Sequence, residues 1–165
     1  MQYMEKFQES REKARRNIML ADHMLTQTYP LIKDPKLLLA VIENIFLALT
    51  NSMATVLYYE RLFKRIPPFH DNFESKFNLF KMKTAIRYNI SQEYLYLMQE
   101  VKDIIIEHRK SPVEFTRENK FVICSSTYNM KTISVDQMKK YIQKTKSFLE
   151  IAESIVSKNE SIFVK

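Results

Sequence analysis

The chain has 165 residues, a formal net charge of +7 and no glycine. About a dozen glycines would be expected at average usage. Their absence excludes the P-loop, the dinucleotide-binding fingerprint and the nucleophile elbow, since each of these motifs needs glycine at fixed positions. Tight β-hairpins also favour glycine in their turns, so the composition favours a fold built mainly of helices.

Cysteine and histidine usage gives no sign of a metal centre or a cofactor. Cys124 is the single cysteine, so neither an intramolecular disulfide nor a CxxC zinc pair is available. The three histidines, His23, His70 and His108, lie far apart and lack metal-ligand spacing. We therefore expect no metal and no cofactor.

The length fits one domain over residues 1–165. The N-terminal sequence MQYMEKFQES is charged and has no signal-peptide core. The longest apolar runs, 37–42 and 45–49, are short and are separated by Glu43 and Asn44. They fall short of the ~20 residues that span a bilayer, so we expect a cytoplasmic protein without a membrane segment.

A first helix is predicted from Tyr3 to Thr28, ending before Pro30. Apolar residues recur there at alternating steps of three and four, with Arg11 in the one vacant position. These apolar residues are Met4, Phe7, Ala14, Ile18, Ala21 and Leu25. The helix therefore presents a narrow apolar stripe.

A second helix is predicted from Asp34-Pro35 to about Arg65. Aspartate accepts hydrogen bonds from the free N–H groups of a helix start, and proline is tolerated in the first turn. The helix is apolar on most sides, as a central helix would be, and Pro67-Pro68 ends it.

Two further helices are predicted between residues 71 and 108. Asp71 has capping-box spacing to Glu74 and opens the third helix. Asn89 is the best available left-handed residue to end it, and Ser91 caps the fourth helix. That helix ends before Ser111-Pro112.

Residues 120–133 are rich in β-branched and aromatic residues, which predicts a short hairpin with Asn129 in its turn. Ser134 and Gln137 then form a capping box for a last helix that runs to about Lys158. The predicted fold class is therefore all-α: an antiparallel bundle of about five helices with a short β-hairpin before the last. The narrow stripe on the first helix and the apolar second helix leave room for a second copy, so we expect a homodimer.

The net positive charge favours an acidic partner such as RNA. Nine basic residues gather at the predicted helix ends and form the candidate nucleic-acid site. They are Arg61, Lys64, Arg65, Lys83, Arg87, Arg109, Lys110, Arg117 and Lys120. Phosphate binding needs several such cations on one face, whereas cations at helix C-termini also occur simply because the helix dipole favours them.

Several tyrosines could serve as stacking platforms for bases, although packing with the hydroxyl in water is the commoner role. They are Tyr58, Tyr59, Tyr88, Tyr94, Tyr96 and Tyr128. Cys124 lies between apolar residues, which indicates a small buried side chain and not a nucleophile.

The segment ADHMLTQTYPLIKDPKLLLAVIENIFLALTNSMATVLYYE, residues 21–60, has a helix, a short connection begun by Asp-Pro and a long apolar helix. In this architecture the chain resembles the HEPN (higher eukaryotes and prokaryotes nucleotide-binding) superfamily. The resemblance implies a helical bundle that acts as a dimer. Many such proteins are metal-independent ribonucleases or toxins, which use an arginine, a polar neighbour and a histidine a few residues later.

Two stretches match that spacing in part. Arg16-Asn17 to His23 keeps the polar neighbour but lies in the first helix, whereas the family places its motif late in the bundle. Arg65 to His70 has Ile66 in the polar position and two intervening prolines. The resemblance therefore implies an inactive relative more than a nuclease.

Three functions follow as hypotheses. The first is a non-enzymatic, homodimeric module that contacts RNA or a ribonucleoprotein without membrane or metal. The second is a HEPN-type endoribonuclease with Arg65 and His70, or Arg16 and His23, assembled across a dimer. The third is an assembly factor that binds only proteins. The sequence leaves enzymatic activity open and favours a protein that is not an enzyme.

Overall fold

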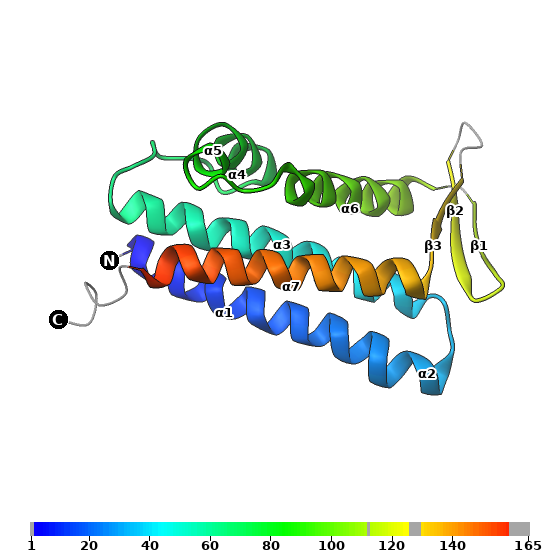
Figure 1. Ribbon diagram of the computed structural model, residues 1–165. Helices are drawn as coiled ribbons and strands as arrows, with labels where there is room; N and C mark the ends of the chain where they lie inside the picture. The colour runs from blue at the N-terminus through cyan, green and yellow to red at the C-terminus, as the bar shows by residue number, and fades with distance from the viewer. Residues whose placement is uncertain (1, 112, 126–129, 159–165) are drawn as a thin grey trace.

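The computed structural model describes residues 2–111, 113–125 and 130–158, and these residues are mostly helical (Figure 1). The helices are α1 Gln2–His23, α2 Tyr29–Ile32, α3 Leu37–Leu62, α4 Phe73–Leu79, α5 Ala85–Arg87, α6 Gln92–Lys110 and α7 Val135–Ser157. Two π-helical turns, η1 Met24–Thr28 and η2 Phe80–Thr84, interrupt this series. The strands are β1 Val113–Arg117, β2 Lys120–Cys124 and β3 Met130–Ile133. The predicted class, a helical fold with a small β element before the last helix, is confirmed.

The first helix does not stop before Pro30 as predicted. It widens into the π turn η1 and continues through Pro30 to Ile32, where Lys33 ends it in the left-handed conformation at φ 56°. Proline normally breaks a helix because it lacks an N–H and its ring collides with the carbonyl four residues earlier. A π turn changes the spacing of the backbone hydrogen bonds, so the helix can continue past the proline. Sequence spacing alone cannot show such a widening.

Helix α3 begins slightly later than predicted and ends earlier. The carboxylate Oδ1 of Asp34 accepts a hydrogen bond from the Lys36 N–H at 3.0 Å, which makes a turn just ahead of the helix. Every residue from Ser52 to Glu60 is buried, in keeping with a central helix. By length and composition alone α3 could cross a membrane. In the structure it is instead the helix that α1, α6 and α7 all contact.

The predicted caps hold at α6 and α7 but need correction at α3 and α4. The N-cap of α3 is Lys36, not Asp34, and it makes no side-chain cap. Asn72, and not Asp71, caps α4, since its Oδ1 accepts from the Ser75 N–H at 2.8 Å. Asn89 is left-handed at φ 51°, as predicted. Ser91 caps α6, and the Oγ of Ser134 accepts from Gln137 at the start of α7, also as predicted.

The predicted two-stranded hairpin is instead a three-stranded antiparallel sheet in the order β1-β2-β3. The strand β1 was not expected. It is joined to β2 by a turn in which Glu118 and Asn119 both have positive φ, 50° and 63°. The turn that was expected at Asn129 lies outside the described residues. The sheet is tied to α6, because His108 Nδ1 lies 2.6 Å from the Oε1 of Glu114 in β1.

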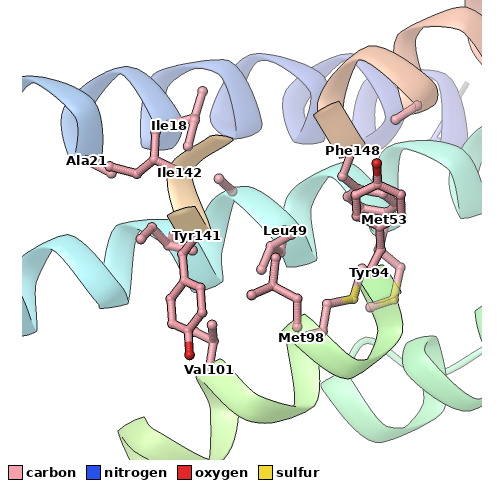
Figure 2. Close-up of a cluster of buried hydrophobic side chains, with 14 of the residues drawn as sticks. Ile18, Ala21, Leu49, Met53, Tyr94, Met98, Val101, Tyr141, Ile142 and Phe148 are labelled. Atoms are coloured by element: carbon pink, nitrogen blue, oxygen red, sulfur yellow. The ribbon is translucent and has the colours of Figure 1, made fainter. Parts of the chain in front are cut away.

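The core lies where α1, α3, α6 and α7 meet (Figure 2). Ile18 and Ala21 of α1 approach Ile142 of α7, while Leu49 of α3 lies near Met98 of α6. The Phe148 ring of α7 packs against Phe80 and Tyr94 at centroid distances of 5.9 and 5.3 Å. Arg11, in the vacant position of the α1 stripe, forms a two-point ion pair with Glu153 of α7 at 2.8 and 2.6 Å.

Candidate functional site

The structure separates the nine predicted nucleic-acid-binding residues into two groups. Arg61, Lys64 and Arg65 lie at the end of α3, beside the η2–α5 segment that carries Lys83 and Arg87. Arg109, Lys110, Arg117 and Lys120 lie at the end of α6 and in the sheet. Figure 1 shows these two regions at opposite ends of the molecule.

The first group surrounds the fully buried carboxylate of Glu60. Arg87 donates to its Oε2 at 2.9 Å, and Arg65 lies 3.8 Å from the same atom. Arg87 also donates to the backbone oxygen of Arg65 at 3.2 Å. Buried carboxylates need such partners, because an unpaired charge away from water is strongly unfavourable. Arg65 and Arg87 are therefore engaged by the buried Glu60, although their side chains remain partly exposed, and the prediction had not foreseen this anchoring role.

Aromatic rings complete this cluster. Arg65 donates to the hydroxyl of Tyr88 at 3.2 Å, and its guanidinium lies 4.9 Å from the ring centre of Phe63. Burial and the neighbouring Glu60 carboxylate together raise the pKa of Tyr88 to about 12. Arg61 donates to the carbonyl of Ile66 at 3.2 Å. The arginines of this end thus fasten the chain after α3 to α5.

Lys64, Lys81 and Lys83 are exposed at this end and make no ion pair within the described residues. Lys64 has a left-handed backbone with φ 54°, where α3 has ended. Three lysines can contact only a few phosphates, and they therefore make a weak phosphate-binding surface, because counterion release grows with the number of phosphates contacted.

The second group is organised by the sheet. The register pairs Phe115 with Val122 and Val122 with Thr132, so these three residues form a row across β1, β2 and β3. Arg117 pairs with Lys120 in the next row, on the same face, since side chains two residues apart on a strand point the same way. A shallow cavity of about 300 Å³ lies on this face, and Met130 also lines it.

This outer sheet surface, defined by Phe115, Arg117, Lys120, Met130 and Thr132, combines exposed apolar side chains with two cations. Phe115 is 40% exposed and Met130 is 64% exposed. Neither Arg117 nor Lys120 makes an ion pair within the described residues. An exposed aromatic ring beside unpaired cations can stack a base and hold its phosphate.

Sequence reasoning found the two cations of this surface but missed Phe115. The signal was present in Val-Glu-Phe-Thr-Arg, which alternates as a half-buried strand does. The connecting turn, Glu118-Asn119, contains no glycine, so the usual hairpin signal is missing. Arg109 and Lys110, at the end of α6, are exposed near the same sheet.

Of the two Arg–His pairs, Arg16 and His23 share one exposed face of α1. They line a shallow groove of about 540 Å³ together with Met19 and Leu20, which are 70% and 42% exposed. Arg65 is held by Glu60 and Tyr88, while His70 lies exposed in the segment before α4, and no contact between the two is found.

The tyrosines divide as follows. Tyr58, Tyr59 and Tyr94 are buried, and Tyr88 is half-buried in the Glu60 cluster, as the packing interpretation predicted. Tyr96 is exposed, and Tyr128 lies outside the described residues. Cys124 is half-exposed in β2, which corrects the expectation that it is buried. Among the described residues, no group of three or more His, Cys, Asp or Glu side chains is placed to hold a metal ion.

No family model, no curated protein and no solved structure matches this chain. Its function is therefore inferred from its own residues and geometry.

Proposed function

We propose that the protein is a non-enzymatic helical module that contacts RNA, or the RNA of a ribonucleoprotein, through the outer sheet surface. The observation that carries this proposal is the exposed Phe115 beside the unpaired Arg117 and Lys120 on one face of the sheet. The small size of the surface favours a few unstacked nucleotides over a long duplex, since single-stranded binding relies on stacking and backbone charge.

Arg109 and Lys110 are exposed at the end of α6, and strand β1 follows this helix in the chain. These two residues extend the proposed contact from the sheet onto α6. The bound RNA would be recognised by its backbone and by stacking, because the sequence contains no base-reading motif. Binding should therefore be tolerant of sequence and sensitive to salt.

The test is fluorescence anisotropy with a labelled single-stranded oligoribonucleotide over a salt series. The double variant Arg117→Gln/Lys120→Gln should weaken binding and reduce the magnitude of the log–log salt slope by about 1.4, since each lost phosphate contact removes ~0.7 for single strands. The matched control is Lys139→Gln/Lys144→Gln, which removes two exposed, unpaired lysines from α7. A flat salt response in the parent protein would reject RNA and favour the assembly-factor alternative.

The second candidate is a HEPN-type endoribonuclease that uses Arg16 and His23. The observation that favours it over the Arg65–His70 version is the shared exposed groove on α1. In such an enzyme the histidine would act as general base on a 2′-hydroxyl, and the arginine would stabilise charge on the phosphate. RNA cleavage in EDTA by the parent, abolished by His23→Ala and retained by His70→Ala, would establish it; no cleavage by the parent would reject it.

The finer architectural proposal is a homodimeric antiparallel bundle of the HEPN type. It is supported by the short connection between α1–α2 and α3, which pack along each other, and by the exposed Met19 and Leu20 on the outer face of α1. Sedimentation analysis of the parent and of Met19→Glu/Leu20→Glu tests the dimer. A monomeric parent at micromolar concentration contradicts it.

A further inference from the structure

A pocket of about 250 Å³ lies between helices α1, α3 and α7 and shares no residue with the outer sheet surface. Figure 1 shows these three helices running side by side, and each of them contacts the other two. Ala14 of α1, Ser52 of α3 and Ala152 of α7 line the pocket. Because all three side chains are small, the helices leave a space between them at this level.

The hydroxyl group of Ser52 is the polar group that indicates a ligand in this pocket. Only 2% of Ser52 is exposed, and its side chain makes no hydrogen bond within the described residues. Its Oγ is not among the partnerless atoms that are sealed from solvent, so the hydroxyl is reached from the pocket that Ser52 lines. A buried hydroxyl almost always has a partner, so this one indicates a partner that is brought from outside.

The rest of the lining is apolar or has its charge already paired. Leu149 and the aliphatic stems of Arg11 and Arg15 supply apolar surface. The carboxylate of Glu153 lies 2.6 Å from Arg11 and 3.0 Å from Arg15, and Glu150 is exposed to water. An ionic ligand would have to compete with these ion pairs and lose its own hydration beside apolar side chains. The pocket therefore favours a neutral ligand.

Two hydroxyl groups on one face of α3 define the polar part of that ligand. Thr55 lies three residues after Ser52 and also lines the pocket. The Thr55 Oγ1 donates to the carbonyl of Asn51 at 2.8 Å, so it offers the ligand only acceptor positions, whereas Ser52 can still donate. A ligand hydroxyl matches this pair, because it accepts and donates at once. An apolar cavity of ~150 Å³ holds benzene, so there is room here for one ring with a short polar substituent.

We propose that this pocket binds a small neutral molecule with an apolar body and one hydroxyl group, the chemical class of the simple aryl and alkyl alcohols. The ligand hydroxyl accepts a hydrogen bond from Ser52 and donates one to Thr55. The apolar body lies against Ala14, Leu149 and Ala152. The pocket is separate from the outer sheet surface, so this proposal does not rest on the proposed RNA contact.

The test is a titration with benzyl alcohol followed by amide and methyl NMR shifts, with toluene as the matched ligand that lacks the hydroxyl group. Benzyl alcohol should shift the signals of Ala14, Ser52 and Ala152 until they saturate. Toluene should shift the same signals, since it fills the same apolar space. The absence of saturable shifts with millimolar benzyl alcohol would overturn the proposal.

Ser52→Ala tests the hydrogen bond to the ligand. It removes a hydroxyl without a partner from a helix, so the melting temperature of the free protein should not fall. Benzyl alcohol should bind about fivefold more weakly, because one neutral hydrogen bond is lost, whereas the affinity for toluene should not decrease. The matched control is Ser147→Ala on the exposed side of α7, which should leave both affinities unchanged. An unchanged affinity of Ser52→Ala for benzyl alcohol, or an equal loss for both ligands, would overturn the proposal.

Variants that fill the pocket test its place in the fold. Ala14→Leu and Ala152→Leu each put a larger side chain into the space from a different helix, so a folded variant of either kind should lose saturable binding of both ligands. Retained binding by a folded filling variant would place the ligand elsewhere and overturn the proposal. Neither alanine borders the outer sheet surface, so the RNA affinity of these variants should match that of the parent and reports on the proposed function separately.

Discussion

At the scale of single residues, the most informative groups are charged side chains that form ion pairs within the protein. Glu60 is fully buried, and its Oε2 is shared by Arg87 and Arg65. Arg11 and Arg15 both contact Glu153. The sequence shows the positive charges but not which of them are already paired, because their partners lie 5 to 142 positions away along the chain.

Replacing Arg87 by Met should destabilise the protein by about 2 kcal/mol, because it removes a charge-assisted hydrogen bond and leaves Glu60 buried with a weaker partner. The double variant Glu60→Leu/Arg87→Met should be more stable than Arg87→Met, since no charge then stays buried. Urea unfolding measures both, with the exposed Arg109→Met as control. A loss below ~0.5 kcal/mol for Arg87→Met, the size of an ordinary surface change, would contradict the anchoring role.

Glu153 predicts a pH dependence. Burial acts to raise the pKa of this carboxyl, but the hydrogen bonds and charges of Arg11 and Arg15 outweigh burial and hold the pKa below its ordinary value of 4.5. A carboxyl whose folded-state pKa is lowered stabilises the fold above its unfolded pKa, and this contribution is lost as the pH falls through the folded pKa. The parent should therefore lose more unfolding free energy than Glu153→Gln between pH 7 and pH 3. Parallel losses in the two proteins would show that the ion pair contributes nothing.

At the scale of elements, helix starts follow local chemistry and therefore follow the sequence closely. The starts of α6 and α7 were predicted at Ser91 and Ser134, and the structure confirms both caps. The missed features, the π turns and β1, depend on contacts beyond the local window. Helix α1 continues past Pro30 through a widened turn, and β1 exists because β2 supplies its hydrogen-bond partners.

Ser134→Ala should lower the unfolding free energy by about 1 kcal/mol, the usual effect of losing an N-cap oxygen. Ser134→Asp should retain most of the stability, because aspartate accepts the same Gln137 N–H. Thermal unfolding followed by circular dichroism measures both variants. If Ser134→Asp is as unstable as Ser134→Ala, the loss comes from local packing and not from the cap.

Phe148 joins α7 to the rest of the core through its ring contacts with Phe80 and Tyr94. Phe148→Ala should cost about 3–5 kcal/mol because it opens a cavity in a region that is closely packed. The same measurement on Phe115→Ala, in the outer sheet surface, should show a small change while RNA binding weakens. A large loss of stability for Phe115→Ala would assign that ring to packing.

At the scale of the whole molecule, the basic residues lie at two opposite ends, and only the sheet end combines free cations with an exposed aromatic ring. This comparison applies to the part of the chain that the structure describes. The same end also carries a cavity of about 470 Å³ between α2, the β1–β2 turn and the start of α7. The anchoring end, built around Glu60, and the sheet end, to which we assign RNA binding, thus lie at opposite ends of the long helices.

The two ends predict different responses to charge removal. Lys64→Gln/Lys83→Gln should leave RNA affinity within about twofold of the parent, since these lysines lie at the α3 end. Arg117→Gln/Lys120→Gln should weaken RNA binding markedly. Anisotropy at one fixed low salt concentration compares them directly. The opposite ranking would move the interface to the α3 end.

The sequence by itself determined the helical class, the single buried helix α3 and the starts of α6 and α7, because periodicity and caps act over a few neighbouring residues. The lack of glycine had favoured helices over tight hairpins. The structure nevertheless shows Lys33, Glu118 and Asn119 in the left-handed conformation, the last two in the β1–β2 turn. Only the tertiary structure decided which cations are consumed by Glu60 and which remain free, since pairing depends on side chains that folding brings together from distant parts of the chain.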